Sequence, residues 1–576
     1  MTPPLVSTPD LSASTWTRRL VAFLALGLMI CIQSCKNGGG PPAQVSNDPP
    51  RRQPKDPGER SLLMGRVTDV SGNPVADAKV VIQGRPDLTV SGKDGGFRFL
   101  LPHKTLVPLV LAASKPGYYT GGTRISSLVV FGLIQLEPLP PADPSRNDFL
   151  TSKDCSACHI EEVKEWKQSR MGWTGMNAWV HDLLDGTGTS GGAGGFVYMR
   201  DGFHSGKLPF SDCSSCHTPL LAKGRHGASM GNLKNPSPLK IESVTCDLCH
   251  KIKRVDLNFE NFPGVHPKVS QFHLPKDEPS NPLVFGSLLD STYSNGVMKP
   301  SYSPLLADGH SLCATCHEDN VDVDGDGDYQ DEGSLSHMST YSEWRSSRYA
   351  VQGEGRLTCV DCHMPLTTRT TIANLNGVEG RRVFGHNFPS LRSLGQSVDL
   401  RIRAEKLPDR KTLVTIEVEN TGAGHSIPTG VMLRNVLLIV EAETLQNPIP
   451  LVVGSRLDKI AGEGGLASNG YYSGVAGKVY ARVFRDRKNN WPAFSTEAIS
   501  LVYDTRLAAG AIDKQVFVFG ATTETVFVKA RLIYRRAYRS VVDQKGWKTD
   551  GFGLPLEDLK PPWFGVLLKR VQTVSK

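Results

Sequence analysis

The chain has 576 residues, too many for one hydrophobic core, because domains usually divide beyond about 250 to 300 residues. We therefore expect two or three domains. Hydrophobic residues make up 39% and charged residues 21% of the chain, while 57 glycines and 39 prolines predict many turns and much irregular backbone. The formal net charge is +8 at pH 7, and its meaning for partners depends on what else the chain binds.

Residues 1–35 predict an export signal, because two arginines precede an apolar run over 20–32 and polar residues follow it. The run is shorter than the about 20 apolar residues that a membrane-spanning helix needs. It ends in a motif that resembles the lipobox of bacterial lipoproteins. The resemblance implies that Cys35 is acylated and anchors the mature protein to a membrane, with a lysine after it that favours the outer membrane. An ordinary signal peptide or an uncleaved anchor is the alternative. Residues 36–59 predict a flexible tether.

Residues 60–138 alternate apolar and polar positions between Gly, Pro and Asp turns, which is typical of a small β-sandwich. The stretch contains three turns, Gly72-Asn73-Pro74-Val75, Lys93-Asp94-Gly95-Gly96 and Lys115-Pro116-Gly117-Tyr118. With these turns it resembles the carboxypeptidase regulatory-like domain. It implies a spacer or adhesion module without catalytic activity.

Ten of the twelve cysteines fall into five copies of C-x-x-C-H, and the other two lie in the leader. At this spacing two thiols reach the two vinyl groups on one edge of a haem, while the histidine supplies an iron ligand. The pattern predicts five covalently bound haem c groups. Their attachment residues would be Cys155, Cys158 and His159; Cys213, Cys216 and His217; Cys246, Cys249 and His250; Cys313, Cys316 and His317; and Cys359, Cys362 and His363.

Three other uses of paired cysteines explain the motif less well. Structural zinc and disulfides do not require a histidine after each pair, and thioredoxin-like motifs occur singly within a βαβ pattern. Five haems would supply apolar bulk, so residues 148–395 are expected to form a haem-packed region of short helices and loops. Haem propionates would also offset the positive charge, which removes the argument for a nucleic-acid partner.

A weak internal repeat and renewed strand signals mark the second half of the chain. The segment 165–170, Glu-Trp-Lys-Gln-Ser-Arg, recurs at 343–348 as Glu-Trp-Arg-Ser-Ser-Arg, and both fit short amphipathic helices. Alternating apolar positions over 412–419 indicate strands. We predict a second β-sandwich over 396–545 and a C-terminal tail over 546–576. The predicted fold class is thus multidomain, with a β-sandwich at each end of a central region of short helices and loops.

Three further stretches stand out in the second half of the chain. They are Thr340-Tyr341-Ser342-Glu343-Trp344, Cys359-Val360-Asp361-Cys362-His363-Met364-Pro365 and Gly422-Ala423-Gly424-His425-Ser426-Ile427-Pro428-Thr429-Gly430. With them the chain resembles the periplasmic multihaem cytochrome c family related to the tetrahaem carrier of hydroxylamine oxidation. The resemblance spans roughly 150–540 and implies closely stacked haems, mostly bis-histidine ligation and electron transfer. It departs at Met171, where the family pattern has a histidine that would serve as a distal ligand.

Four histidines outside the motifs are predicted as sixth iron ligands: His310, His337, His386 and His425. The alternative is that they are loop histidines satisfied by solvent. Met171 and Met298 are alternative thioether ligands, although core packing is the commoner role of methionine. The remaining histidines are interpreted as non-ligating, and they are His103, His181, His204, His226, His266 and His273.

An acidic run places oxygen ligands at alternate positions around a glycine turn and predicts an EF-hand-like calcium loop. A solvated acidic turn is the alternative. The candidate ligands are Asn320, Asp322, Asp324, Asp326 and Asp331.

The leading functional hypothesis is an exported, lipid-anchored cytochrome that relays electrons through saturated, low-spin haems. Its partners would be other cytochromes or quinol-linked membrane complexes, in the periplasm or at the cell surface. The alternative is a multihaem reductase or oxidase of a small nitrogen or sulfur compound at an open haem. No C-x-x-C-K motif of the nitrite reductase kind is present in the mature chain.

Overall fold

The computed structural model describes part of the chain. The chain divides into two units, 1–58 and 59–576, and all described residues lie in the second. Cys35 and the tether fall outside them, as do His103, His204, His226 and His266. The described residues are 60–575 without 103, 147, 202–212, 224–229, 231–242, 258–269, 277–281, 293–297, 325–332, 370–380, 389–394, 495–496 and 554–565.

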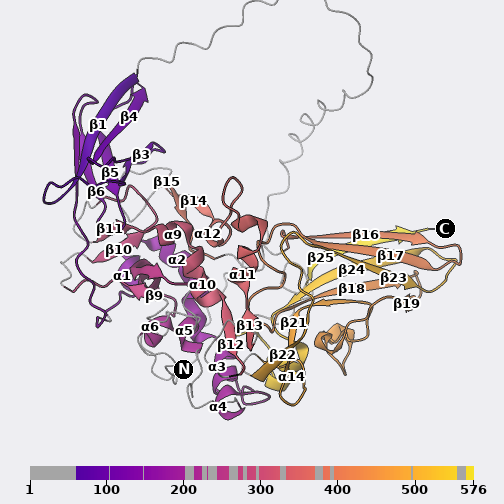
Figure 1. The fold of residues 1–576 in the computed structure, drawn as a ribbon. Helices are drawn as coiled ribbons and strands as arrows, with labels where there is room; N and C mark the ends of the chain where they lie inside the picture. Colours follow the sequence, from indigo (N-terminus) through magenta and orange to yellow (C-terminus); the bar gives the residue numbers. More distant parts are fainter. Residues whose placement is uncertain are drawn as a thin grey trace, which may run out of the picture. The chain divides into compact units, whose positions relative to one another are not determined.

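The predicted N-terminal β-sandwich forms from two sheets (Figure 1). In β1, β4 and β7 exposed and buried residues alternate, so one face of the sheet is apolar and packs on the other sheet. The core includes Leu63, Val67, Phe97, Leu111 and Ile134. The first sheet orders β4 (Gly96–Pro102), β1 (Arg60–Asp69) and β7 (Gly132–Leu136); the second orders β3 (Leu88–Val90), β2 (Lys79–Ile82), β5 (Leu109–Ser114) and β6 (Gly121–Ile125).

The central region consists of short helices joined by loops and two-stranded ribbons, as predicted. Its apolar clusters are small; the largest centres on Leu220, Leu248 and Ile252. The helices are α1 (Ser152–Ser156), α2 (Ile160–Gln168), η1 (Met171–Met176), α3 (Ala178–Leu184), α4 (Tyr198–Asp201), α5 (Cys213–His217), α6 (Pro219–Ala222), α8 (Cys246–Lys251), α9 (Pro304–Asp308), α10 (His310–His317), α11 (Thr340–Arg345), η2 (Arg348–Ala350) and α12 (Cys359–His363).

Four antiparallel or parallel ribbons connect these helices. They are β8 (Ile252–Val255) with β9 (Ser270–Phe272), β10 (Leu283–Gly286) with β11 (Lys299–Tyr302), β12 (Asp319–Asp322) with β13 (Ser334–Met338), and β14 (Leu366–Arg369) with β15 (Arg381–Phe384).

The C-terminal β-sandwich encloses the largest apolar core among the described residues. One sheet orders β16 (Val398–Lys406), β17 (Thr412–Asn420), β23 (Ile512–Phe519) and β19 (Leu451–Val453). The other orders β20 (Gly477–Tyr480), β18 (Asn435–Glu443), β24 (Val526–Arg535) and β25 (Val566–Val574). Strand β25 lies within 546–576, which was predicted to be a C-terminal tail, and it pairs antiparallel with β24.

The predicted fold class, a β-sandwich at each end of a central region of short helices and loops, is confirmed.

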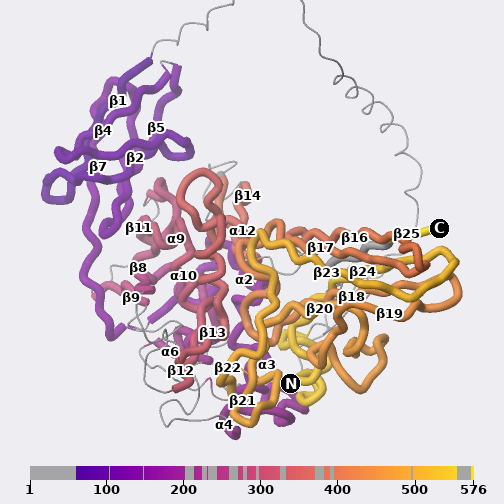
Figure 2. Tube along the Cα trace, turned by 45° about the vertical axis from the view of Figure 1, so that its right-hand side comes forward, coloured from indigo at the N-terminus to yellow at the C-terminus, as the bar shows by residue number. Residues whose placement is uncertain are grey.

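A second apolar cluster joins the C-terminal region to α3 of the central region, and both views place α3 near β22 (Figures 1 and 2). Trp179 of α3 stacks on Trp547 with ring centroids 4.1 Å apart. Lys545, in α14 (Arg539–Lys545), donates to the carbonyl of Asp182 at 2.9 Å.

The remaining elements are β21 (Arg482–Asp486), β22 (Ala498–Asp504), η3 (Lys459–Ala461) and η4 (Ala467–Asn469).

None of the helices in the described ranges has the length and apolar character needed to cross a membrane.

Tyr538 tests the packing behind the C-terminal sandwich. Its side chain is fully buried, and its hydroxyl donates to the carbonyls of Met432 and Arg482. We expect Tyr538→Phe to lower the free energy of unfolding by about 1–2 kcal/mol, because buried carbonyls lose a donor. Denaturant unfolding measures the change. Tyr471→Phe is the control: its hydroxyl contacts exposed Asp543, where water can replace it. Equal losses in the two variants would contradict this account.

Candidate cofactor-binding site

All five C-x-x-C-H motifs form helical turns. The motifs in α5, α8, α10 and α12 are helical throughout, and in the first motif the His159 amide donates to the Cys155 carbonyl at 2.9 Å. Threonines stand directly before two of these turns, Thr245 before α8 and Thr358 before α12; Thr245 accepts from the Leu248 amide at 3.1 Å. In a helical turn the residues i, i+3 and i+4 share one face, so both thiols and the imidazole of a motif lie together. This is the arrangement that haem attachment requires.

The structure gives no support to the other uses of paired cysteines. All ten motif cysteines are described, and none of them forms a disulfide there. Across the described residues, no three or more His, Cys, Asp or Glu side chains gather as a metal site. A tetrahedral zinc site would need such a group.

Two motif histidines each face one predicted distal histidine. The rings of His250 and His386 have centroids 6.5 Å apart and planes 19° apart. For His363 and His425 the values are 6.3 Å and 14°. Two imidazoles on opposite sides of one metal have centroids roughly 6 Å apart, because each metal–nitrogen bond is about 2 Å long. Both pairs therefore fit six-coordinate haem iron.

Backbone carbonyls orient several of these imidazoles. The Nδ1 atom of His250 contacts the Phe285 carbonyl at 2.6 Å, and that of His425 contacts the Ser426 carbonyl at 3.0 Å. An Nδ1–H bonded in this way leaves Nε2 as the ligating atom.

Burial keeps the distal rings in the ligating form. Burial and neighbouring His250 lower the pKa of His386 to about 4, and burial also lowers the pKa of His425. Both imidazoles are therefore neutral near pH 7, as a metal ligand must be.

His310 has the surroundings of an iron ligand but faces no motif histidine among the described ring pairs. Its Nδ1 lies 2.7 Å from a carboxylate oxygen of Asp308, an arrangement that commonly orients metal-binding histidines. Its ring lies beside a cavity of about 290 Å³. His310 and His317 occupy the same face of α10, about 10 Å apart along the axis, so they cannot bind one iron. His310 would serve a different motif. The cavity is lined by Lys253, Arg254, Val255, Pro304, Leu305, Asp308, His310 and Ser311.

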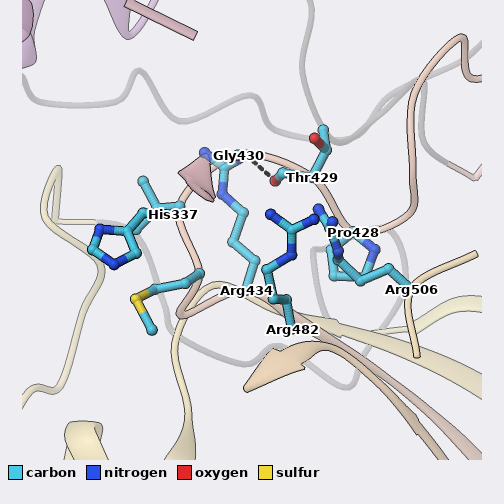
Figure 3. A pocket seen from close by; sticks show the side chains of 9 residues that line it. His337, Pro428, Thr429, Gly430, Arg434, Arg482 and Arg506 are labelled. Carbon is cyan, nitrogen blue, oxygen red and sulfur yellow. Dashed lines mark hydrogen bonds between the residues drawn. The ribbon is translucent and has the colours of Figure 1, made fainter. Parts of the chain in front are cut away.

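His337 lies on β13 with 3% of its surface exposed, and neither ring nitrogen has a hydrogen-bond partner among the described residues. Burial lowers its pKa to about 3. Figure 3 shows the ring beside a cavity that Arg434, Arg482 and Arg506 also line. A buried imidazole with two orphaned nitrogens fits an axial ligand better than a surface loop residue.

Two histidines interpreted as non-ligating are buried. His181 contacts the Gly175 carbonyl through Nε2 at 2.8 Å, and it lies close enough to His217 to lower the pKa of that imidazole, which burial already depresses to about 4. His273 contacts the Pro140 carbonyl through Nε2 at 2.8 Å. His181 is thus a candidate that sequence reasoning passed over, since nothing in its local sequence resembles a ligand loop.

The remaining predicted ligands are the thioether of Met171 and the residues of the calcium loop. Met171 packs at the edge of the small apolar cluster of the central region, as a core methionine does. Of the proposed calcium ligands, Asn320 and Asp322 lie in β12 and Asp324 follows it. Asp326 and Asp331 lie outside the described residues, so the calcium loop stays a prediction.

The motifs contact one another in an order that differs from their order in the sequence. A hydrogen bond with Cys246 raises the pKa of the Cys155 thiol, which places the first motif beside the third. Burial and neighbouring Cys316 raise the pKa of Cys249 to about 12, which places the third beside the fourth. Helix α10, the fourth motif, also contacts α12 and α5. The fourth motif therefore touches the second, third and fifth.

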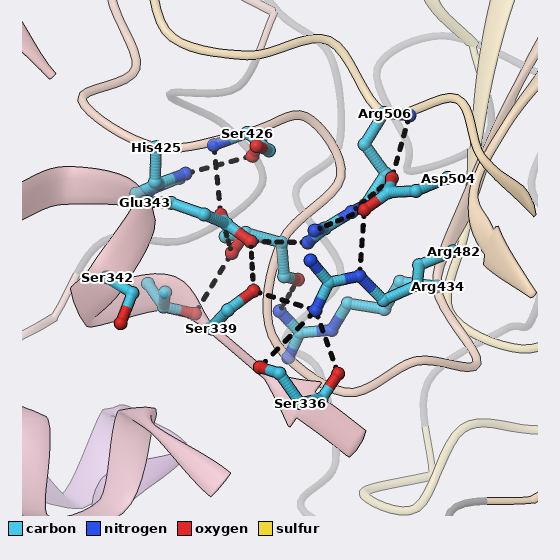
Figure 4. Close-up of polar contacts among 12 residues, drawn as sticks. Ser336, Ser339, Ser342, Glu343, His425, Ser426, Arg434, Arg482, Asp504 and Arg506 are labelled. Atoms are coloured by element: carbon cyan, nitrogen blue, oxygen red, sulfur yellow. Dashed lines mark hydrogen bonds and ion pairs between the residues drawn. The ribbon is translucent and has the colours of Figure 1, made fainter. Parts of the chain in front are cut away.

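A buried ionic network lies behind the His425 loop (Figure 4). The Glu343 carboxylate accepts from the Ser426 amide at 3.0 Å and from the Thr429 hydroxyl at 2.7 Å, and it pairs with Arg506. Arg506 in turn pairs with Asp504 at 2.8 Å. Burial alone would raise the pKa of Glu343, but Arg506 and these hydrogen bonds lower it below its usual value.

Comparison with known proteins relates the fold of this chain to that of a solved structure. No protein-family model and no curated protein matches the sequence. A solved structure, the penta-haem cytochrome c552 from Thermochromatium tepidum, aligns with a TM-score of 0.50 and 17% identity, covering 74% of this chain and 98% of that chain. The fold of this chain is similar to that of a penta-haem cytochrome c.

MtrC from Shewanella baltica aligns over 90% of this chain and 70% of that chain, at 10% identity and a TM-score of 0.12, too low to indicate a shared fold. The similarity to the penta-haem cytochrome agrees, at the level of the fold, with the resemblance to multihaem cytochromes seen in the sequence. The relation to hydroxylamine oxidation and the regulatory-like domain stay predictions.

Arg506 tests the ionic network, since its side chain is 7% exposed and it pairs with two carboxylates. We expect Arg506→Met to lower the free energy of unfolding by about 3–5 kcal/mol at pH 7, because it leaves buried charges unpaired. The pKa values of Glu343 and Asp504 are lowered from 4.5 and 3.8, so the stabilisation exists above pH 4.5 and is lost as the pH falls through the folded values.

Denaturant midpoints at pH 7 and at lower pH measure this difference. The loss caused by Arg506→Met should shrink on acidification, because protonated carboxyls no longer need a cation. The control is Arg403→Met, whose side chain is 81% exposed and which should change stability by less than about 0.5 kcal/mol. A loss independent of pH would contradict the pairing.

Proposed function

We propose that this chain is an exported c-type cytochrome that binds five haems and relays electrons between redox partners. The observation that supports it best is the facing of His250 by His386 and of His363 by His425, each at the ring separation of a six-coordinate iron. The five helical C-x-x-C-H motifs, in which none of the ten cysteines forms a disulfide, supply matching attachment points.

When bound, haem supplies one-electron exchange at its iron, with a potential that axial ligands, burial and nearby charge adjust. The chain's residues would hold each group covalently and close the iron to substrate. His386 and His425 would be the distal ligands of the third and fifth haems. The candidates for the first, second and fourth haems are the half-buried His310 and the buried His337 and His181.

The contacts among motifs support a path for electrons. Neighbouring thiols connect the first motif to the third and the third to the fourth, and α10 contacts both α12 and α5. We propose that the haems follow this order, with the fourth as a junction to the second and fifth. Such a branched arrangement suits a relay with more than one exit.

The sequence of residues 1–59 supports the cellular setting. The leader and the lipobox-like Cys35 favour export and a lipid anchor, on the periplasmic side or at the outer membrane. Other cytochromes or quinol-linked membrane complexes would then be the partners. The N-terminal sandwich would act as a spacer or adhesion module between the tether and the haem region.

The alternative activity is reduction or oxidation of a small nitrogen or sulfur compound at an open haem. One observation favours this alternative. Met171 stands where the family pattern has a histidine, and it packs against an apolar cluster. If one iron lacked a sixth protein ligand, a small molecule could bind there.

Haem content is the first test. We expect the purified mature protein to contain five haem c groups per chain by pyridine haemochrome assay, with an intact mass that exceeds the polypeptide by five haems. Replacing Cys213 and Cys216 together by Ala should remove one haem and leave four. A mass equal to the bare chain, or bound zinc, would contradict the proposal.

Spin state is the second test. His386→Ala and His425→Ala should each convert one low-spin iron to high spin, because each removes one axial ligand. Electron paramagnetic resonance of the oxidised protein measures this. His273→Gln is the control, since that ring contacts the Pro140 carbonyl and lies against Phe285, and no ring pair among the described residues joins it to a motif histidine. Unchanged spectra in both Ala variants would mean that these histidines are not ligands.

A further inference from the structure

The weak sequence repeat is also a structural repeat. It places Glu165 and Trp166 on α2 and Glu343 and Trp344 on α11. Each helix ends in the same way. The serine three residues after the tryptophan donates its hydroxyl to the tryptophan carbonyl at 2.7 Å in both copies. The two helices are therefore equivalent units, and their outward contacts can be compared.

Each tryptophan donates a hydrogen bond to the backbone just before a C-x-x-C-H motif. Trp166 Nε1 donates to the Val244 carbonyl at 2.8 Å, and Trp344 Nε1 donates to the Leu357 carbonyl at 2.8 Å. Both carbonyls belong to the residue two positions before the first cysteine, in the third and the fifth motif respectively. Both indoles are buried, at 5% and 8% exposed. The tryptophans thus hold the motifs that contain His250 and His363.

Each glutamate binds a loop that bears a distal histidine. The Glu165 Oε2 atom accepts from the backbone amide of His386 at 2.8 Å. The Glu343 Oε2 atom accepts from the amide of Ser426, next to His425, at 3.0 Å. A charged acceptor makes these bonds stronger than bonds between neutral groups.

Both carboxylates are held by arginines. Arg369 Nη2 lies 2.8 Å from Glu165, and Arg506 pairs with Glu343. The two arginine side chains are 9% and 7% exposed. Each carboxylate is therefore paired with a buried cation and directed at its loop.

In both copies the tryptophan binds the backbone just before the motif that contains one histidine of a pair. The glutamate of the same copy binds the loop that contains the other histidine of that pair. We propose that the Glu-Trp dipeptide is a clamp that sets the separation between the two axial histidines of one haem. Glu165 would be the positioning residue for His250 and His386, and Glu343 the one for His363 and His425. This inference rests on the proposed haem ligation.

The clamp predicts what happens when its carboxylate is lost. Without the glutamate, the loop that bears the distal histidine loses the hydrogen bond that connects it to the helix beside the C-x-x-C-H motif. The distal histidine then leaves its iron part of the time, and an added ligand can take its place. Carbon monoxide, which binds reduced iron with an open position, is a suitable probe.

The experiment measures carbon monoxide uptake by the reduced protein, from the change in the Soret band, for Glu165→Ala and Glu343→Ala. Each variant should bind more carbon monoxide than the unaltered protein, up to one further equivalent per chain. Glu165→Gln keeps an acceptor oxygen and should show a smaller increase. The matched controls are Glu161→Ala, on α2, and Glu354→Ala, which follows α11 in the sequence. Both residues are exposed, so both variants should bind as much carbon monoxide as the unaltered protein.

A double substitution assigns the effect to one iron. His386→Ala opens the third haem, so adding Glu165→Ala should give no further uptake, whereas adding Glu343→Ala should give up to one further equivalent. Equal uptake in the two double variants would overturn the clamp, as would unchanged uptake in both single glutamate variants. A loss of stability alone would not produce this pairwise pattern.

The haem count separates this failure from failure of the proposed function. If the protein contains no haem, there is no Soret band and the ligation itself is wrong. If five haems are present and the pairwise pattern is missing, only the clamp is wrong.

Discussion

The separation between two facing imidazole rings is the constraint on which the rest of this structure depends. An iron between two nitrogens requires ring centroids roughly 6 Å apart, and the pairs at 6.5 and 6.3 Å meet that requirement. Each pair joins a helical motif to a loop distant in the chain. The helices, ribbons and C-terminal sandwich bring the two histidines of each pair to the separation that an iron between them would require.

The C-terminal sandwich supports the loop that bears His425. His425 lies in the loop between β17 and β18, and Asn420, at the end of β17, donates to the His425 carbonyl at 2.9 Å. A loop tied to a packed sheet positions a ligand more accurately than a free loop. In the central region, where the apolar clusters are small, the haems themselves would supply much of the interior.

Local features of this fold could be predicted from the sequence, and long-range pairings could not. The C-x-x-C-H spacing determines thiol and imidazole geometry within one helical turn, and period-two alternation indicated both sandwiches. The Glu-Trp repeat was visible, but its partners lie far away: Val244 is 78 residues from Trp166, and His386 is 221 residues from Glu165. Which distal histidine faces which motif depends on the tertiary fold. His181 is buried by the same long-range packing.

The central claim is that an iron lies between His250 and His386 and another between His363 and His425. Diffraction from crystals of the haem-loaded protein, recorded at the iron absorption edge, locates each iron directly. The account predicts five iron positions, with one midway between the rings of each pair. An iron bound to His250 or His363 with a different residue, or with no protein group, on its other side would contradict it.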